Sequence, residues 1–170
     1  MRQKECILST DGLAVIAEVA IGLAGFSGIL IVLTRPDGGF NPPERFRLRV
    51  LVFSSMGALF LAMIPFAVLD SDWSDHTSWQ ILGALVLIYT LYGLVSLPRI
   101  SFELRRQYPD IFPLRLILTQ VATHLGTLGL ALPLCFGTSS NQQNLYTGAL
   151  ILILVHGAIA FVRLLFYRRH

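Results

Sequence analysis

Charged residues are scarce in this chain of 170 residues: they make up 14% of it, whereas an ordinary soluble domain carries about 25%. So little charge cannot cover the surface of a soluble fold, and it also excludes a disordered chain. Only two cysteines are present, which excludes a disulfide-rich secreted scaffold. Hydrophobic residues, in contrast, make up 54% of the chain, and its mean hydropathy is +0.66. This composition is typical of an integral membrane protein.

The sequence also lacks the common catalytic and nucleotide-binding motifs. It has no Gly-x-x-x-x-Gly-Lys loop, no dinucleotide fingerprint and no paired-cysteine metal site. Two short fragments resemble rhomboid intramembrane proteases: residues 25–28 match their Gly-x-Ser-Gly, and residues 124–126 are similar to part of their histidine helix. The resemblance implies serine chemistry by Ser27 with His124, but it covers only these fragments, and the chain has five predicted spans rather than six. We therefore predict no catalytic residue, no bound metal and no nucleic-acid partner.

Five apolar runs are each long enough to cross a membrane as a helix, which takes about 20 residues. They predict an all-α integral membrane protein, a five-helix transmembrane bundle that forms a single membrane domain over residues 1–170. Proline or glycine marks several of the predicted ends, as at Pro36, Pro98 and Gly137. The predicted spans are 13–34, 50–69, 79–97, 116–136 and 145–162.

Arginine and lysine are distributed unequally between the two sides of the predicted spans. Residues 35–49, 98–115 and 163–170 hold 11 of the 13, the amino-terminal tail holds the other 2, and the remaining two loops hold none. The positive-inside rule places the basic side in the cytoplasm. The amino terminus is then outside and the carboxyl terminus cytoplasmic. The expected location is a membrane, the bacterial inner (cytoplasmic) membrane, with the lipid bilayer as the immediate partner.

Glu18 is the only acidic residue inside a predicted span. A charge in hydrocarbon costs about 2.5–3.5 kcal/mol on insertion scales, so such a residue is expected to face protein or water. Gly22, Gly25 and Gly28 follow it at helical spacing, and small residues let another backbone approach closely. We predict that this face packs against another helix. Glu18 is then either an ion or proton site or a hydrogen-bonded carboxyl that holds helices together.

His124 and His156 lie near the middle of the fourth and fifth predicted spans, 12 and 11 residues from the outer ends. At 1.5 Å per residue both lie about 16–18 Å deep, and the short loop between the spans makes the two helices antiparallel neighbours. Two histidines at one depth could pass a proton, bind a metal, hold haem or simply bond across a helix contact. Gln120 and Tyr89 lie near the same depth, which indicates a polar layer through the bundle.

The leading hypothesis is a channel-like or transporter-like membrane protein that is not an enzyme. It is expected to work as a homo-oligomer, because five short helices barely enclose a pathway. The candidate ion or proton sites are Glu18, His124, His156, Gln120 and Tyr89. The first alternative is a non-catalytic anchor or accessory subunit of a larger membrane complex. The second is an electron carrier with haem b bound through His124 and His156, and no other cofactor is expected.

Overall fold

The computed structural model describes residues 2–34, 39–70 and 72–166. These residues form five α-helices and no strand, which confirms the all-helical class. All five helices are long and apolar enough to cross a membrane. Insertion in a membrane and orientation within it stay predictions. The helices are α1 (Arg2–Thr34), α2 (Pro42–Val68), α3 (Asp75–Gln107), α4 (Leu114–Phe136) and α5 (Gln142–Phe166).

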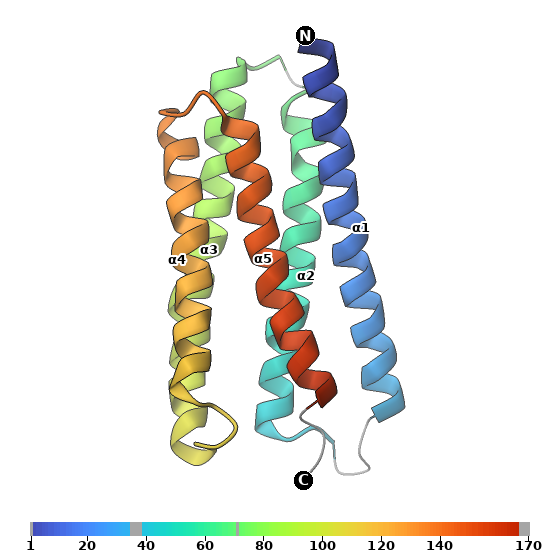
Figure 1. Cartoon of the computed structure of the whole chain (residues 1–170), viewed down its shortest axis with the longest axis vertical. Helices are drawn as coiled ribbons and strands as arrows, with labels where there is room; N and C mark the ends of the chain where they lie inside the picture. The colour runs from blue at the N-terminus through green and yellow to red at the C-terminus, as the bar shows by residue number, and fades with distance from the viewer. Residues whose placement is uncertain (1, 35–38, 71, 167–170) are drawn as a thin grey trace.

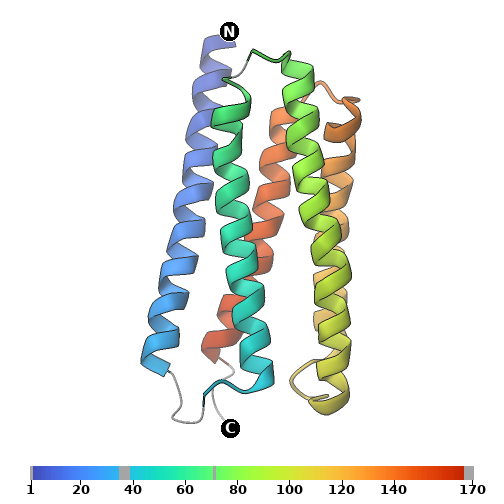
Figure 2. The same cartoon turned by 180° about the vertical axis from the view of Figure 1, so that it is seen from behind.

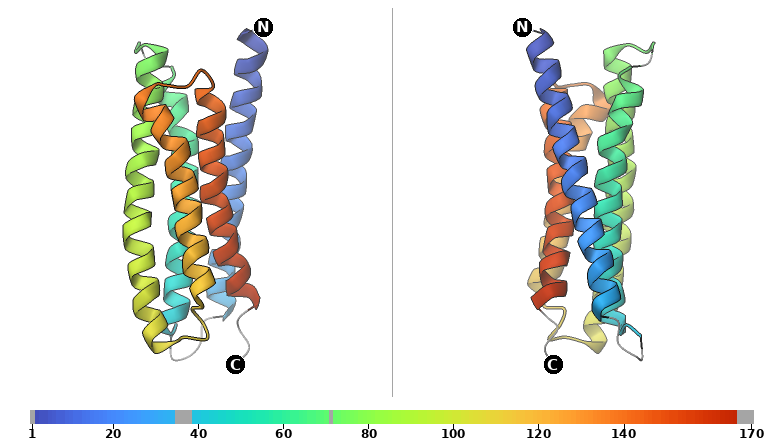
Figure 3. Two further views of the ribbon diagram at one scale, coloured as in Figure 1. Left: turned by 60° about the vertical axis from the view of Figure 1, so that its left-hand side comes forward. Right: turned by 90° about the vertical axis from the view of Figure 1, so that its right-hand side faces the viewer.

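The helices run up and down beside one another, each antiparallel to the next in the chain (Figures 1 and 2). Helices α2 to α5 surround the centre, and α1 packs on the outside against α2 and α5 (Figure 3). Helices α4 and α5 are antiparallel neighbours, as predicted. We call the end with the α1–α2 and α3–α4 connections the basic end. Its arginines in the described residues are Arg45, Arg47, Arg49, Arg99, Arg105, Arg106, Arg115 and Arg163.

A capping box explains where α2 begins, and a glycine in a left-handed conformation explains where α4 ends. The side chain of Asn41 accepts from the backbone N–H of Glu44 at 2.9 Å, and the Glu44 carboxylate accepts from the backbone N–H of Asn41 at 3.0 Å. This capping box satisfies two backbone donors at the start of α2. Helix α4 ends at Gly137, whose φ of +64° is a left-handed conformation that glycine adopts without strain.

Pro98 does not end α3, which corrects the predicted end of the third span. The helix continues through this proline to Gln107. Proline removes one backbone N–H, and long membrane helices tolerate this loss where neighbouring groups hold the chain in place. Pro98 is buried in the bundle, so packing fixes its position. Residues 99–107, expected as part of a loop, therefore extend α3 at the basic end.

Pro65 lies inside α2, and a tyrosine of α5 compensates for it. Because proline has no backbone N–H, the carbonyl of Leu61, four residues earlier, loses its usual helical donor. The buried hydroxyl of Tyr146 donates to that carbonyl oxygen at 2.5 Å. This hydrogen bond ties α5 to α2 in the half of the bundle away from the basic end.

Two apolar clusters fill the two halves of the bundle. The larger one, which we call the distal core, lies in the half away from the basic end, and the smaller one lies at the basic end. The buried members of the distal core include Leu13, Ile16, Ala20, Ala58, Leu61, Leu82, Val86, Ala131, Leu134, Tyr146 and Leu150. The smaller cluster holds Phe46, Val50, Leu51, Leu97, Leu104, Phe112 and Ala160.

Candidate functional site

Buried polar side chains lie around the middle of the bundle and extend along α3 and α4 toward the basic end, and we call them the polar layer. They come from all four central helices: Ser54, Ser55, Thr90, Ser101, Gln120, His124, Thr127 and His156. Three candidate residues proposed from the sequence, His124, His156 and Gln120, belong to this set. Polar groups in such surroundings are stable only with hydrogen-bond partners, so their bonds define the site.

His124 of α4 and His156 of α5 lie side by side. Their ring centroids are 4.8 Å apart, and the rings meet edge to face at 85°. Both side chains are buried. The equal depth expected from the sequence therefore corresponds to direct contact.

Hydrogen bonds orient both rings. The Nδ1 of His124 lies 2.8 Å from the backbone oxygen of Gln120, and because a carbonyl only accepts, this nitrogen carries the hydrogen. The Nδ1 of His156 lies 3.1 Å from Oγ1 of Thr123. The same Thr123 hydroxyl lies 2.9 Å from the Gln120 oxygen. Thr123 and Gln120 thus link the two histidines by hydrogen bonds.

The two Nε2 atoms have different surroundings. The Nε2 of His124 lies against the backbone of α3 at Gly93, where a Cβ would come within 2.4 Å of it. The Nε2 of His156 is buried and has no hydrogen-bond partner in the part of the chain that the structure describes. A buried imidazole nitrogen in this state is available to a ligand or a water molecule.

Tyr89 of α3 lies beside the histidines and is held by α2. Its hydroxyl donates to the backbone oxygen of Phe53 at 3.1 Å, and its ring stacks on that of Phe53 with centroids 4.5 Å apart. Gly57 makes room for the ring, since a Cβ there would lie 2.3 Å from it. Tyr89 helps to enclose a small cavity next to the histidines. The cavity is lined by Ser54, Tyr89, Thr90, Thr123, His124, Thr127, Leu152, Ile153 and His156, a largely polar set that favours water.

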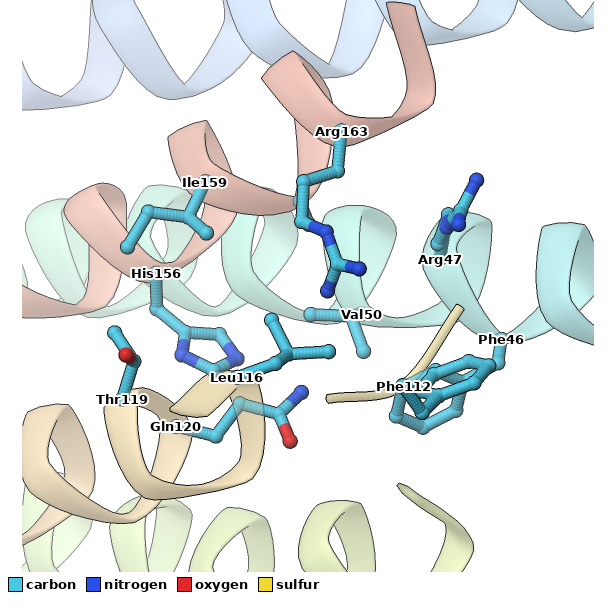
Figure 4. A pocket seen from close by; sticks show the side chains of 11 residues that line it. Phe46, Arg47, Val50, Phe112, Leu116, Thr119, Gln120, His156, Ile159 and Arg163 are labelled. Atoms are coloured by element: carbon cyan, nitrogen blue, oxygen red, sulfur yellow. The ribbon is translucent and has the colours of Figure 1, made fainter. Parts of the chain in front are cut away.

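A recess leads from His156 toward the basic end, and we call it the basic recess (Figure 4). His156 and Arg163 extend from α5 toward α4, from which Thr119 and Gln120 extend back (Figure 4). Arg163 is anchored, because its Nη2 donates to the backbone oxygen of Ile111 at 2.7 Å. The lining residues are Phe46, Arg47, Val50, Phe112, Leu116, Thr119, Gln120, His156, Ile159, Ala160 and Arg163.

Arg47 and Arg163 were not among the residues proposed from the sequence. On α2 the buried positions include a stripe that recurs every three or four residues: Pro43, Arg47, Val50, Ser54, Ala58, Leu61 and Pro65. Arg47 lies on this stripe, so the helical period could have placed it inside the bundle. No pattern in the sequence indicates that Gly93 makes room for His124, because this depends on which residue of α4 packs against it.

Glu18 lies away from this site. It is exposed on α1, which contacts α2 and α5 but not α4 among the described residues. A Cβ added at Gly22, Gly25 or Gly28 would meet nothing within 4 Å in the same part of the chain. Among the described residues no other helix packs closely on this face, and the predicted helix contact stays a prediction, now for a contact with another chain.

The geometry does not support two of the sequence-based alternatives. Ser27 donates its hydroxyl to the backbone oxygen of Leu23 in its own helix, and α1 does not contact α4 in the described residues, so Ser27 and His124 are not brought together. A haem bound by His124 and His156 would need its porphyrin plane between the two rings. Rings in direct edge-to-face contact leave no space for it.

The described residues contain no group of three or more histidine, cysteine, aspartate or glutamate side chains that could hold a metal ion. What the arrangement offers instead is a connected set of hydrogen-bonding groups beside a recess with two arginines. No protein-family model, curated protein or solved structure matches the chain.

Proposed function

We propose that the chain is a transporter-like membrane protein that moves protons through its polar layer. The observation that carries this proposal is the buried contact between His124 and His156, which lies between the basic recess and the distal core. Ionisable residues within membrane spans commonly mark proton relays or substrate pathways. The five apolar helices are compatible with such a protein.

The side chains provide the parts of a proton relay. A neutral imidazole accepts a proton on one nitrogen and can release another from the second. A proton that enters by the basic recess would bind Nε2 of His156, and the proton on Nδ1 would pass to Oγ1 of Thr123, 3.1 Å away. Thr123 would at the same time give its own hydroxyl proton to a water molecule in the small cavity that it lines together with His124. The Gln120 oxygen accepts from both Thr123 and His124 and holds them in place without carrying the proton.

The side chains of the recess suit a proton better than a metal cation. In the described chain its lining residues include Arg47 and Arg163 but no carboxylate, so they offer no anionic ligand to a metal ion. Imidazole and hydroxyl groups suffice for a proton relay, whereas cation sites use several carboxylate or carbonyl oxygens.

The closed distal core supports a transporter-like cycle rather than an open channel. On the far side of the histidines the bundle is filled by buried side chains such as Leu82, Val86 and Ala131. The hydrogen bond from Tyr146 to Leu61 crosses the same half. Access from the basic end alone corresponds to one state of an alternating-access mechanism.

Proton flux into liposomes tests this proposal. The purified protein would be reconstituted with a pH-sensitive dye inside, and an imposed membrane potential would drive protons. We expect His156→Gln and His124→Gln to lower the flux at least tenfold, about 1.4 kcal/mol in the barrier. His76→Gln is the matched control, because His76 is exposed at the other end of the bundle. No flux in the wild type, or equal flux in all four proteins, would contradict the proposal.

The exposed face of α1 supports a second proposal, that two or more copies assemble. Glu18, Gly22, Gly25 and Gly28 form what we call the α1 glycine face, and nothing in the described chain covers it. Covering Glu18 would offset a cost of about 2.5–3.5 kcal/mol in lipid. A second copy is the proposed cover. Native mass spectrometry in detergent should show a defined homo-oligomer, whereas a monomer would favour an accessory subunit of another membrane complex.

A further inference from the structure

We propose that the basic recess binds the phosphate group of an anionic lipid, with an acyl chain against its apolar walls. This site lies between His156 and the basic end, and it goes beyond proton transfer without depending on it. Basic pockets between membrane helices are known to suit anionic lipid headgroups. Charge, shape and hydrogen-bond donors each support the proposal.

Arginines from three helices determine the charge of the site. Arg47 of α2 and Arg163 of α5 line the recess, and Arg47 is only 6% exposed. An adjoining hollow shares Arg163 and Thr119 with the recess and adds Arg115 and Asp110. Three guanidinium groups against one carboxylate leave an excess of positive charge. Guanidinium is also the side-chain group best suited to a phosphate, because its donors match two phosphate oxygens at once.

The walls of the recess suit a lipid better than a free phosphate. They are formed by apolar side chains from α2, α5, α4 and the segment before α4: Phe46, Val50, Phe112, Leu116, Ile159 and Ala160. Thr119, at the mouth, is exposed on the side of α4 within its apolar length. The recess is therefore accessible from the side of the bundle. In a membrane that side faces the acyl chains. An acyl chain gains favourable apolar contact with these walls, whereas a soluble anion has no apolar part that could make this contact.

Hydrogen-bond donors point into the floor of the recess. The Ser101 hydroxyl donates to Oε1 of Gln120 at 2.9 Å, which leaves the amide nitrogen of Gln120 directed toward the recess (Figure 4). His156 is 6% exposed, lines the recess, and has an Nε2 without a partner in the described residues. The amide nitrogen of Gln120 can donate to a phosphate oxygen, and protonated His156, which carries a hydrogen on each ring nitrogen, can donate from Nε2.

Native mass spectrometry with added lipids tests the site. Phosphatidylglycerol should bind at least about fivefold more tightly than phosphatidylcholine with the same acyl chains, a difference of about 1 kcal/mol. Millimolar inorganic phosphate should neither displace the lipid nor stabilise the protein against heat. Equal binding of the two lipids would overturn the proposal. Equal stabilisation by inorganic phosphate would assign the recess to a free anion and overturn the lipid assignment.

Two pairs of variants locate the binding. Arg163→Gln should abolish the preference for phosphatidylglycerol, whereas Arg99→Gln, at an exposed arginine of the same end, should keep it. Thr119→Trp should block the mouth, whereas Leu118→Trp, beside it but outside the lining, should not. Both tryptophans replace exposed side chains, so this pair remains informative if an arginine variant fails to fold. Equal loss within either pair would mean general surface attraction and would overturn the proposal.

Discussion

Tyr146 supplies α2 with the hydrogen bond that Pro65 cannot make. The tyrosine hydroxyl reaches the backbone oxygen of Leu61, the carbonyl left without a helical donor by the proline four residues later. A side chain of α5 thus replaces the backbone hydrogen bond that is missing at the proline of α2. The same bond fixes how α2 and α5 pack in the distal core.

Tyr146→Phe should therefore lower the free energy of unfolding by about 1–3 kcal/mol, because it leaves a buried carbonyl without a donor. In a Pro65→Ala background the restored N–H can bond to Leu61, so the same substitution should cost less than half as much. A double-mutant cycle measured by unfolding in detergent tests this coupling. Equal costs in the two backgrounds would show that the tyrosine does not act through the proline.

Gly83→Ala should destabilise the bundle by about 1–3 kcal/mol, the usual cost of overpacking. A Cβ at Gly83 would lie 2.7 Å from the backbone nitrogen of Cys135, which cannot move aside cheaply. Gly129→Ala is the control, because a Cβ there meets nothing within 4 Å in the described chain, and alanine favours the helix by about 0.5–1 kcal/mol. Thermal unfolding in detergent should rank Gly129→Ala above wild type and Gly83→Ala below it.

Gly25→Leu should disrupt assembly while leaving the single chain stable, since Gly25 faces open space within the chain. Leu23→Ala should do the reverse, because Leu23 is partly buried against the distal core. Chemical cross-linking and unfolding in detergent measure the two effects separately. If Gly25→Leu cross-links as well as wild type, the α1 glycine face is not a contact between copies.

A cysteine at Ser140 should react with a membrane-impermeant thiol reagent applied to intact cells, and a cysteine at Gln107 should not. Both would be introduced after Cys6 and Cys135 are replaced. The two positions lie at opposite ends of the bundle, and the positive-inside rule places Gln107 in the cytoplasm. The reverse labelling pattern would invert the predicted orientation.

The contact between His124 and His156 could be predicted because it follows from how many residues separate each histidine from the end of its span. Hydrophobic runs locate the spans, and helix rise gives depth, so two histidines at one depth on successive helices are expected to meet. The end of α3 could not be read in the same way. A proline ends a helix or is accommodated within it according to the packing around it, and Pro98 is buried.

The surroundings of the histidines depend on which helix faces meet. Gly93, Ser101 and Arg47 gain their roles from neighbours on other helices. Glu18 shows the same limit: a row of small residues indicates that a close contact is possible, not which helix provides it. The sequence therefore predicts the candidate residues better than their partners.

Three contacts spread along α3 hold α3 and α4 together as a hairpin. Gly83 touches the backbone at residues 134–135, Gly93 touches His124, and Ser101 bonds to Gln120. His156 belongs to α5, outside this hairpin. The histidine contact therefore joins this hairpin to α5, so any displacement of the hairpin relative to α5 would separate the two rings and change the lining of the basic recess.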